Sequence, residues 1–78
     1  MWIRSQDKKR LVKCDFIRAN GNEIQANFSS NSYSVIAIYS IEEKALKVLD
    51  MIETHLEYLK YKINREFVFR MPQDDEVE

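Results

Sequence analysis

Residues 40–63, SIEEKALKVLDMIETHLEYLKYKI, hold the clearest change of pattern in the chain, because apolar residues here begin to recur every three or four positions. This spacing predicts a helix with one apolar stripe. Ser40 followed by Glu43 matches a capping box, which places the start of the helix there. The stripe that we expect to pack on a sheet comprises Ile41, Ala45, Val48, Leu49, Ile52, Leu56, Leu59 and Ile63.

The predicted helix is long for so small a chain. About 22 residues of helix span roughly 33 Å, whereas a strand of five or six residues covers about 20 Å. We therefore expect the far end of the helix to extend beyond its own sheet. The residues there that would need a partner are Leu56, Tyr58, Leu59 and Tyr61.

Four strands are predicted before the helix. Residues 2–5 form the first, and residues 11–18 form the second, which alternates with period two. This alternation places Val12, Cys14 and Phe16 on an inward face.

A tight hairpin should join the second and third strands. Asn20 and Gly21 lie between two alternating runs, and both residue types accept the positive φ of a type I′ turn. The third strand then covers residues 23–28. The β-branched and aromatic run at 33–39 is typical of a central strand.

One further strand follows the helix at residues 65–71, and Pro72 ends it because proline lacks an amide donor. This strand can join the edge of the same sheet, which we favour, or pair with its counterpart in a second copy. The predicted fold is therefore a two-layer α+β domain, an antiparallel sheet of four or five strands with one long helix, in the order β-β-β-β-α-β. Residues 1–72 form this single domain, and residues 73–78 form an acidic C-terminal tail that stays solvated.

The size of the chain limits its stability. A domain of 78 residues buries only a little over 60% of its unfolded surface, and such domains often recruit a disulfide, a metal or a second copy. Cys14 is the only cysteine and His55 the only histidine, which leaves a homodimer or higher homo-oligomer as the natural supplement. The single cysteine, with no apolar run suited to a membrane span or a signal peptide, predicts a cytoplasmic protein with no membrane partner.

The charge of the chain is distributed unevenly. Residues 1–22 hold six basic and two acidic side chains, a local net charge of +4, whereas residues 23–78 hold six basic and eleven acidic ones, a local net charge of −5. The basic end is suited to an anion. The acidic remainder argues against a dedicated duplex nucleic-acid binder. The same asymmetry is also compatible with a solvated surface or with contact between copies.

The sequence offers little material for catalysis. Cys14 lies on the predicted inward face, where cysteine is usually a small hydrophobe. Met51 and Leu59 stand four residues on either side of His55, so the helix brings it no second metal ligand at that spacing. Phosphate loops and nucleophile motifs are not found. We therefore expect a protein that is not an enzyme and has no metal site and no cofactor.

Aromatic and basic residues near the start of the chain favour binding. Trp2 and Arg4 lie two positions apart on the first strand and so point to the same face. A planar base can stack on the indole while the guanidinium holds a phosphate. The candidate ligand-binding residues are Trp2, Arg4, Lys8, Lys9, Arg10 and Tyr39. The alternative is that Trp2 is buried against the helix with Arg4 at its rim.

Three stretches carry a resemblance to a known group. The opening WIRSQDKK followed by LV, the middle YS.EEKAL.VLD.I and the closing VF.MPQDDEV resemble small accessory proteins of phages and prophages of Gram-positive bacteria, the clostridial group in particular. The resemblance covers both ends and the start of the helix. It implies a place in the host cell cytoplasm and a role in counter-defence, in which such proteins act by occupancy and not by turnover.

Two hypotheses from different classes follow. In the first, the chain is a homo-oligomeric sponge that sequesters a small nucleotide-derived immune signal. In the second, it is a protein-protein inhibitor of a host defence protein or nuclease, which binds through a sheet edge or the acidic helix face with Glu53 and Glu57. A minor structural or assembly component is a third reading.

Overall fold

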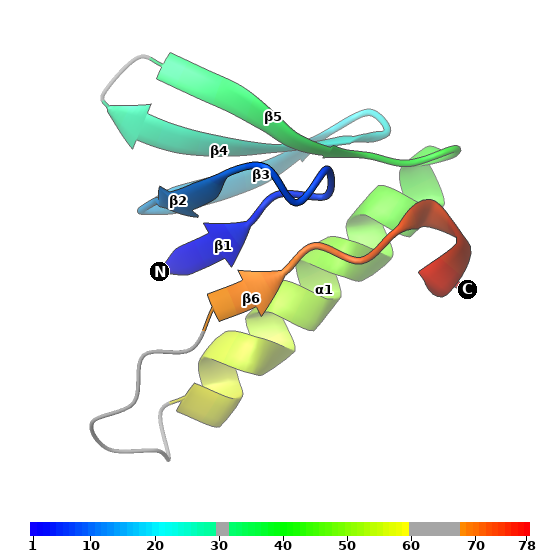
Figure 1. Cartoon of the computed structure of the whole chain (residues 1–78). Coiled ribbons are helices and arrows are strands. Elements are labelled where there is room, and N and C mark those ends of the chain that lie inside the picture. The colour runs from blue at the N-terminus through cyan, green and yellow to red at the C-terminus, as the bar shows by residue number, and fades with distance from the viewer. Residues whose placement is uncertain (30–31, 60–67) are drawn as a thin grey trace.

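The computed structural model describes residues 1–29, 32–59 and 68–78. Its elements are β1 (Trp2–Arg4), β2 (Leu11–Lys13), β3 (Phe16–Asn20), β4 (Glu23–Ser29), β5 (Ser32–Ile38), α1 (Glu42–Leu59), β6 (Val68–Arg70) and the 3₁₀ turn η1 (Asp74–Glu76). The predicted α+β class and the position of the helix after the first strands are confirmed (Figure 1).

The prediction of a single sheet is wrong. The strands form two three-stranded sheets, in the orders β2-β1-β6 and β3-β4-β5. The predicted strand 11–18 breaks at Cys14, whose amide donates to the carbonyl of Met1 at 2.9 Å. Because Lys13, Asp15 and Phe16 are all exposed, the alternation slips by one residue at this break. Phe16 therefore faces outward, 54% exposed, and not inward as the period predicts.

The last strand joins the first within the same chain. β6 pairs with β1 in parallel, which corrects the expectation of a wholly antiparallel sheet. The turn that follows β1 links the two sheets, because the Gln6 amide donates to the Ile36 carbonyl at 2.8 Å and the Ile38 amide donates to Gln6 Oε1 at 2.9 Å. The two sheets thus share one core with the helix.

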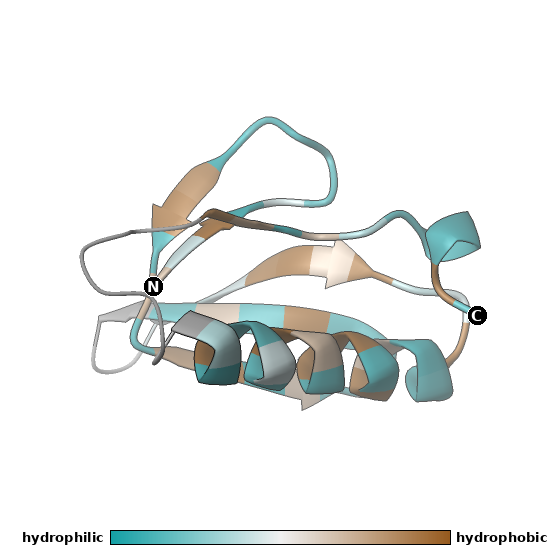
Figure 2. Cartoon of the chain, turned by 90° about the horizontal axis from the view of Figure 1, so that it is seen from below, coloured by the Kyte–Doolittle hydropathy of each residue, from teal (hydrophilic) through white to brown (hydrophobic). Residues whose placement is uncertain are grey.

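The helix lies across the β3-β4-β5 sheet and contacts β3 and β4 (Figure 2). Ala45, Val48 and Ile52 of the predicted stripe are buried, whereas Ile41 and Leu56 are exposed. The predicted continuation of the helix to Ile63 lies outside the described residues. The core around these side chains comprises Ile3, Val12, Cys14, Ile24, Ala26, Ile36, Ala37, Tyr39, Ala45, Val48, Ile52, Phe69, Met71 and Val77.

The acidic C-terminal segment is packed, so the expectation of a solvated tail is wrong. Val77 is only 5% exposed and belongs to the core. Gln73 Nε2 donates to the Gln6 carbonyl at 2.7 Å, and the Ser40 amide donates to Asp74 Oδ1 at 2.7 Å. This amide, more than the nearby ammonium of Lys44, lowers the pKa of Asp74. The segment therefore ties the start of the helix to the turn after β1.

The predicted hairpin is present, with a different turn. Asn20 pairs with Glu23, so the two-residue loop is Gly21-Asn22. Gly21 has a φ of 60° and Asn22 is not among the residues with positive φ. This pattern is that of a type II′ turn, which needs glycine at its first position only.

Replacing Gly21 with alanine is expected to lower the free energy of unfolding by about 1–2 kcal/mol, because a Cβ is disfavoured in the left-handed region. No atom lies within 4 Å of the added Cβ, so the cost comes from the backbone alone. Urea denaturation followed by circular dichroism measures it. Lys8 also has a positive φ, of 67°, so Lys8→Gly is the matched variant. We expect it to change the free energy of unfolding by less than about 0.5 kcal/mol, because relief of the disfavoured φ offsets the entropy that glycine adds to the unfolded chain. Equal stabilities for Gly21→Ala and the unaltered protein would contradict the assignment.

Candidate functional site

The outer face of the β2-β1-β6 sheet is basic. Ile3, Val12 and Phe69 are buried on its inner side, so the residues between them point outward. The strand pairings place Arg4 between Leu11 and Arg70, and Trp2 between Lys13 and Val68. The outer face thus consists of Trp2, Arg4, Leu11, Lys13, Val68 and Arg70, and none of these six is acidic.

A pocket of about 290 Å³ opens beside this face, lined by Arg4, Ser5, Lys8, Arg70 and Met71. Arg4 and Arg70 are direct partners on neighbouring strands, about 4.8 Å apart in the sheet. The turn after β1 places Lys8 beside Arg4, because Arg4 Nε donates a hydrogen bond to the Lys8 carbonyl at 2.8 Å. We call this the basic pocket. Three cations around one hollow create a local positive potential that favours an anion.

The turn at residues 5–10 is held by its own side chains. Asp7 Oδ1 accepts hydrogen bonds from the Ser5 hydroxyl at 2.5 Å and from the Lys9 amide at 2.9 Å. The hydrogen bond from the Ser5 hydroxyl is the main cause that lowers the pKa of Asp7, so this carboxylate stays ionised to a lower pH than an isolated aspartate does. Arg10 donates to the Ser34 hydroxyl at 2.7 Å and to the Val35 carbonyl, which anchors the turn on β5.

The structure brings together some of the predicted ligand-binding residues. Trp2 and Arg4 share the outer face and Lys8 lines the basic pocket, so burial of Trp2 against the helix is not observed. Lys9 is exposed in the same turn. Lys13 Nζ lies 6.0 Å from the centroid of the half-buried indole.

Two predicted residues are not at this pocket. Arg10 is turned toward β5, as its hydrogen bonds show. Tyr39 is enclosed in the core at 2% exposure, and its hydroxyl donates to the Pro72 carbonyl at 2.8 Å. Burial raises the pKa of Tyr39 far above its usual range. The expectation that Tyr39 contacts a ligand is therefore corrected, because the aromatic run that predicted a central strand also places this ring inside.

Arg70 and Lys13 belong to the outer face but were absent from the predicted set. Lys13 follows Val12, whose inward direction was predicted, so alternation alone could have placed it outside. Arg70 follows the buried Phe69 in the same way. Its place beside Arg4 depends on the parallel pairing of β6 with β1, for which the local sequence holds no signal.

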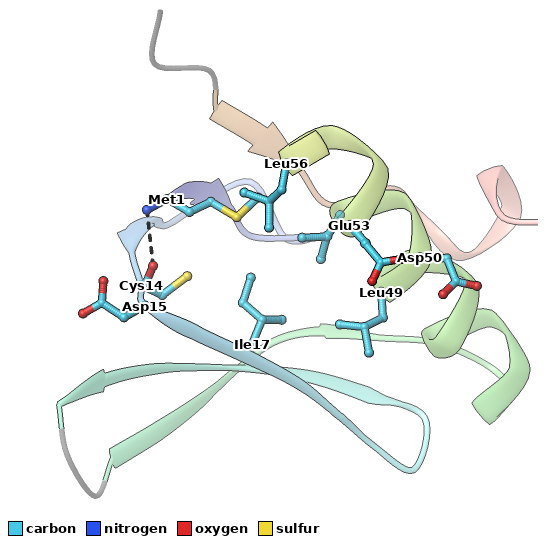
Figure 3. Close-up of a pocket in the computed structure, with 9 residues that line it drawn as sticks. Met1, Cys14, Asp15, Ile17, Leu49, Asp50, Glu53 and Leu56 are labelled. Atoms are coloured by element: carbon cyan, nitrogen blue, oxygen red, sulfur yellow. Dashed lines mark hydrogen bonds between the residues drawn. The ribbon is translucent and has the colours of Figure 1, made fainter. Parts of the chain in front are cut away.

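A second, larger pocket of about 460 Å³ lies between α1 and the break that separates β2 from β3 (Figure 3). Its wall includes the buried Cys14, and burial is the main cause that raises the pKa of this thiol. Its lining combines apolar and acidic side chains: Met1, Cys14, Asp15, Ile17, Leu49, Asp50, Ile52, Glu53 and Leu56. In Figure 3 the Glu53 side chain extends along the cavity while that of Asp15 points away. Its carboxylates make this pocket unsuited to an anionic ligand.

The histidine contributes to packing. The His55 ring lies edge-on to that of Phe69, with centroids 5.4 Å apart. Within residues 1–29, 32–59 and 68–78, no group of three or more His, Cys, Asp or Glu side chains is placed to hold a metal ion. In this same part of the chain, no helix is long and apolar enough to cross a membrane.

Comparison with protein-family models, with curated proteins and with solved structures finds no match for this chain.

Proposed function

We propose that this chain is a non-enzymatic binding protein that holds a small nucleotide-like anion on the outer face of the β2-β1-β6 sheet. The phosphate occupies the basic pocket and the base stacks on Trp2. The observation that carries the proposal is the side-by-side placement of Arg4 and Arg70, with Lys8 closing the hollow next to an indole on the same face. A guanidinium fork suits phosphate oxygens, which it can bind with two hydrogen bonds.

The expected interaction energies reach a useful affinity. A hydrogen bond to a charged group contributes about 1.5–3 kcal/mol, and a base stacked on an aromatic ring contributes about 1–3 kcal/mol. Two arginine contacts and one stacked ring together contribute about 4–9 kcal/mol, and the upper end of this range corresponds to a micromolar dissociation constant, about −8 kcal/mol. A second copy bound across the same face would enclose the ligand further.

The proposed role is counter-defence by sequestration. The resemblance to phage and prophage accessory proteins supports this role, since such proteins act by occupancy. A sponge needs affinity and abundance but no turnover, and the basic pocket supplies the charge that a nucleotide-derived signal requires. We include the homo-oligomer and the cytoplasmic location in this proposal.

Inhibition of a host protein is the second candidate. The larger pocket favours it, because apolar side chains such as Leu49 and Leu56 lie there beside Asp50 and Glu53 of the same helix. A basic amphipathic segment of a partner would complement this surface. The first candidate uses the basic pocket, and the second uses the larger pocket with its carboxylates. A titration with an anionic nucleotide therefore distinguishes them.

Trp2 is the only tryptophan in the chain and serves as the reporter. We expect ATP to quench its fluorescence with a micromolar dissociation constant, and adenosine to bind at least about tenfold more weakly because it lacks the phosphates. Raising the salt concentration should weaken ATP binding, as expected for a charged contact. A folded protein whose fluorescence responds to neither compound at millimolar concentration would overturn the proposal and favour the second candidate.

A further inference from the structure

The outer face of the β3-β4-β5 sheet carries two exposed aromatic rings. Phe16 on β3 and Tyr33 on β5 flank Asn27 of β4 in one row of the sheet. Phe16 is 54% exposed and Tyr33 40% exposed. Their ring centroids are 6.3 Å apart at an interplanar angle of 76°. The two rings form an exposed cluster in which Phe16 presents the larger surface.

A cation lies over the Tyr33 ring of this cluster. The guanidinium carbon of Arg18 lies 3.7 Å from the centroid of the Tyr33 ring, and Arg18 Nε donates to Gln25 Oε1 at 2.9 Å. Gln25 also donates to Glu23 Oε1 at 3.1 Å, which fixes its amide in turn. The guanidinium plane is therefore oriented before any ligand arrives, and unpaired bases stack on such planes as they do on aromatic rings.

This cluster lies close to the basic outer face along the chain. β2 leads into β3 through only two residues, so the Cα atoms of Lys13 and Phe16 are at most about 11 Å apart. Lys13 in turn lies over Trp2. Each sheet thus carries aromatic rings with a cation against one of them: Lys13 lies over Trp2 on one sheet, and Arg18 lies over Tyr33, beside Phe16, on the other. Asp15 is the acidic side chain between Lys13 and Phe16.

We propose that the ligand of this protein is a short single-stranded oligonucleotide, with one base on Trp2 and a later base on Phe16. The inference rests on the proposed function and specifies its ligand class. A mononucleotide would use only the first ring, whereas stacking on both Trp2 and Phe16, which lie on different sheets, needs a strand of more than one nucleotide. Duplex bases are already stacked on one another, so the exposed rings select unpaired strands.

The test uses a fluorescein-labelled strand of eight thymidines and fluorescence anisotropy. Phe16→Ala is expected to weaken binding of this strand by about 5- to 150-fold, the loss of one stacked base, and to leave quenching of Trp2 by ATP within twofold. Ile38→Ala is the matched control, because Ile38 is also 54% exposed and lies on β5 of the same sheet. Asp15→Asn should tighten binding of the strand, because it removes a carboxylate that repels the negatively charged phosphates.

The outcomes separate the inference from the proposed function. If Phe16→Ala binds the strand as tightly as the unaltered protein while ATP still quenches Trp2, the inference is overturned and the proposed function stands. If a duplex of the same length binds as tightly as the single strand, the rings are not used and the inference is likewise overturned. If neither ATP nor the strand binds the folded protein, the proposed function fails and the inference fails with it.

Discussion

Replacing Arg4 and Arg70 together with glutamine is expected to weaken ATP binding at least about 100-fold. Each arginine supplies a charge-assisted contact of about 1.5–3 kcal/mol, and each 1.4 kcal/mol is a factor of ten. The two side chains are partners on adjacent strands and line the same pocket, so the double variant removes most of its charge. Quenching of Trp2 fluorescence by ATP measures the loss.

The controls for this prediction separate charge from folding. Arg4 also holds the turn through the Lys8 carbonyl, so Arg70→Gln alone is the variant that leaves this bond in place, and we expect it to cost about tenfold or more. Lys9→Gln changes the net charge by the same amount at an exposed position that does not line the pocket, and should cost less than about threefold. Equal losses of ATP affinity for Arg70→Gln and Lys9→Gln would show that only the net charge of the protein matters. This result would contradict specific binding of the anion in the basic pocket.

Replacing Val77 with aspartate is expected to unfold most of the protein at 25 °C. Val77 belongs to the core at 5% exposure, so the new carboxylate would lose its hydration without a partner designed for it. Such a change costs several kcal/mol, and a core of this size supplies only about 3–5 kcal/mol in total. Thermal denaturation followed by circular dichroism should show no cooperative transition.

Asp75 is two residues away and exposed, so Asp75→Asn is the control and should melt within about 2 °C of the unaltered protein. A melting temperature for Val77→Asp close to that of this control would mean that the C-terminal segment is dispensable, contrary to its packing. The result would also restore the prediction of a solvated tail.

The parts of the fold that the sequence predicts are those set by local periodicity. Ala45, Val48 and Ile52 follow the helical repeat and are buried, and Gly21 marks the hairpin. The same local reasoning placed Trp2 and Arg4 on one face.

The errors arise where distant contacts override the local pattern. The alternation from Val12 to Phe16 reads as one strand, but the bond from Cys14 to Met1 breaks it, and Phe16 turns outward. The packing of Val77 depends on residues far away in the sequence, as does the pairing of Arg4 with Arg70. Arg70, one of the three cations of the basic pocket, therefore cannot be assigned to it until the strands are paired.

The pairing of β1 with β6 also has a consequence for biosynthesis. β1 is synthesised before β6, the strand that covers its second edge, and β2, β3, β4, β5 and the helix are made between them. Until then the edge of β1 offers unpaired amides and carbonyls, which other chains can bind. The β2-β1-β6 sheet can therefore be completed only after β6 has been made, and long-range pairing of this kind is slow compared with helix formation. A chaperone that shields the N-terminal strands during this interval should raise the yield of folded protein.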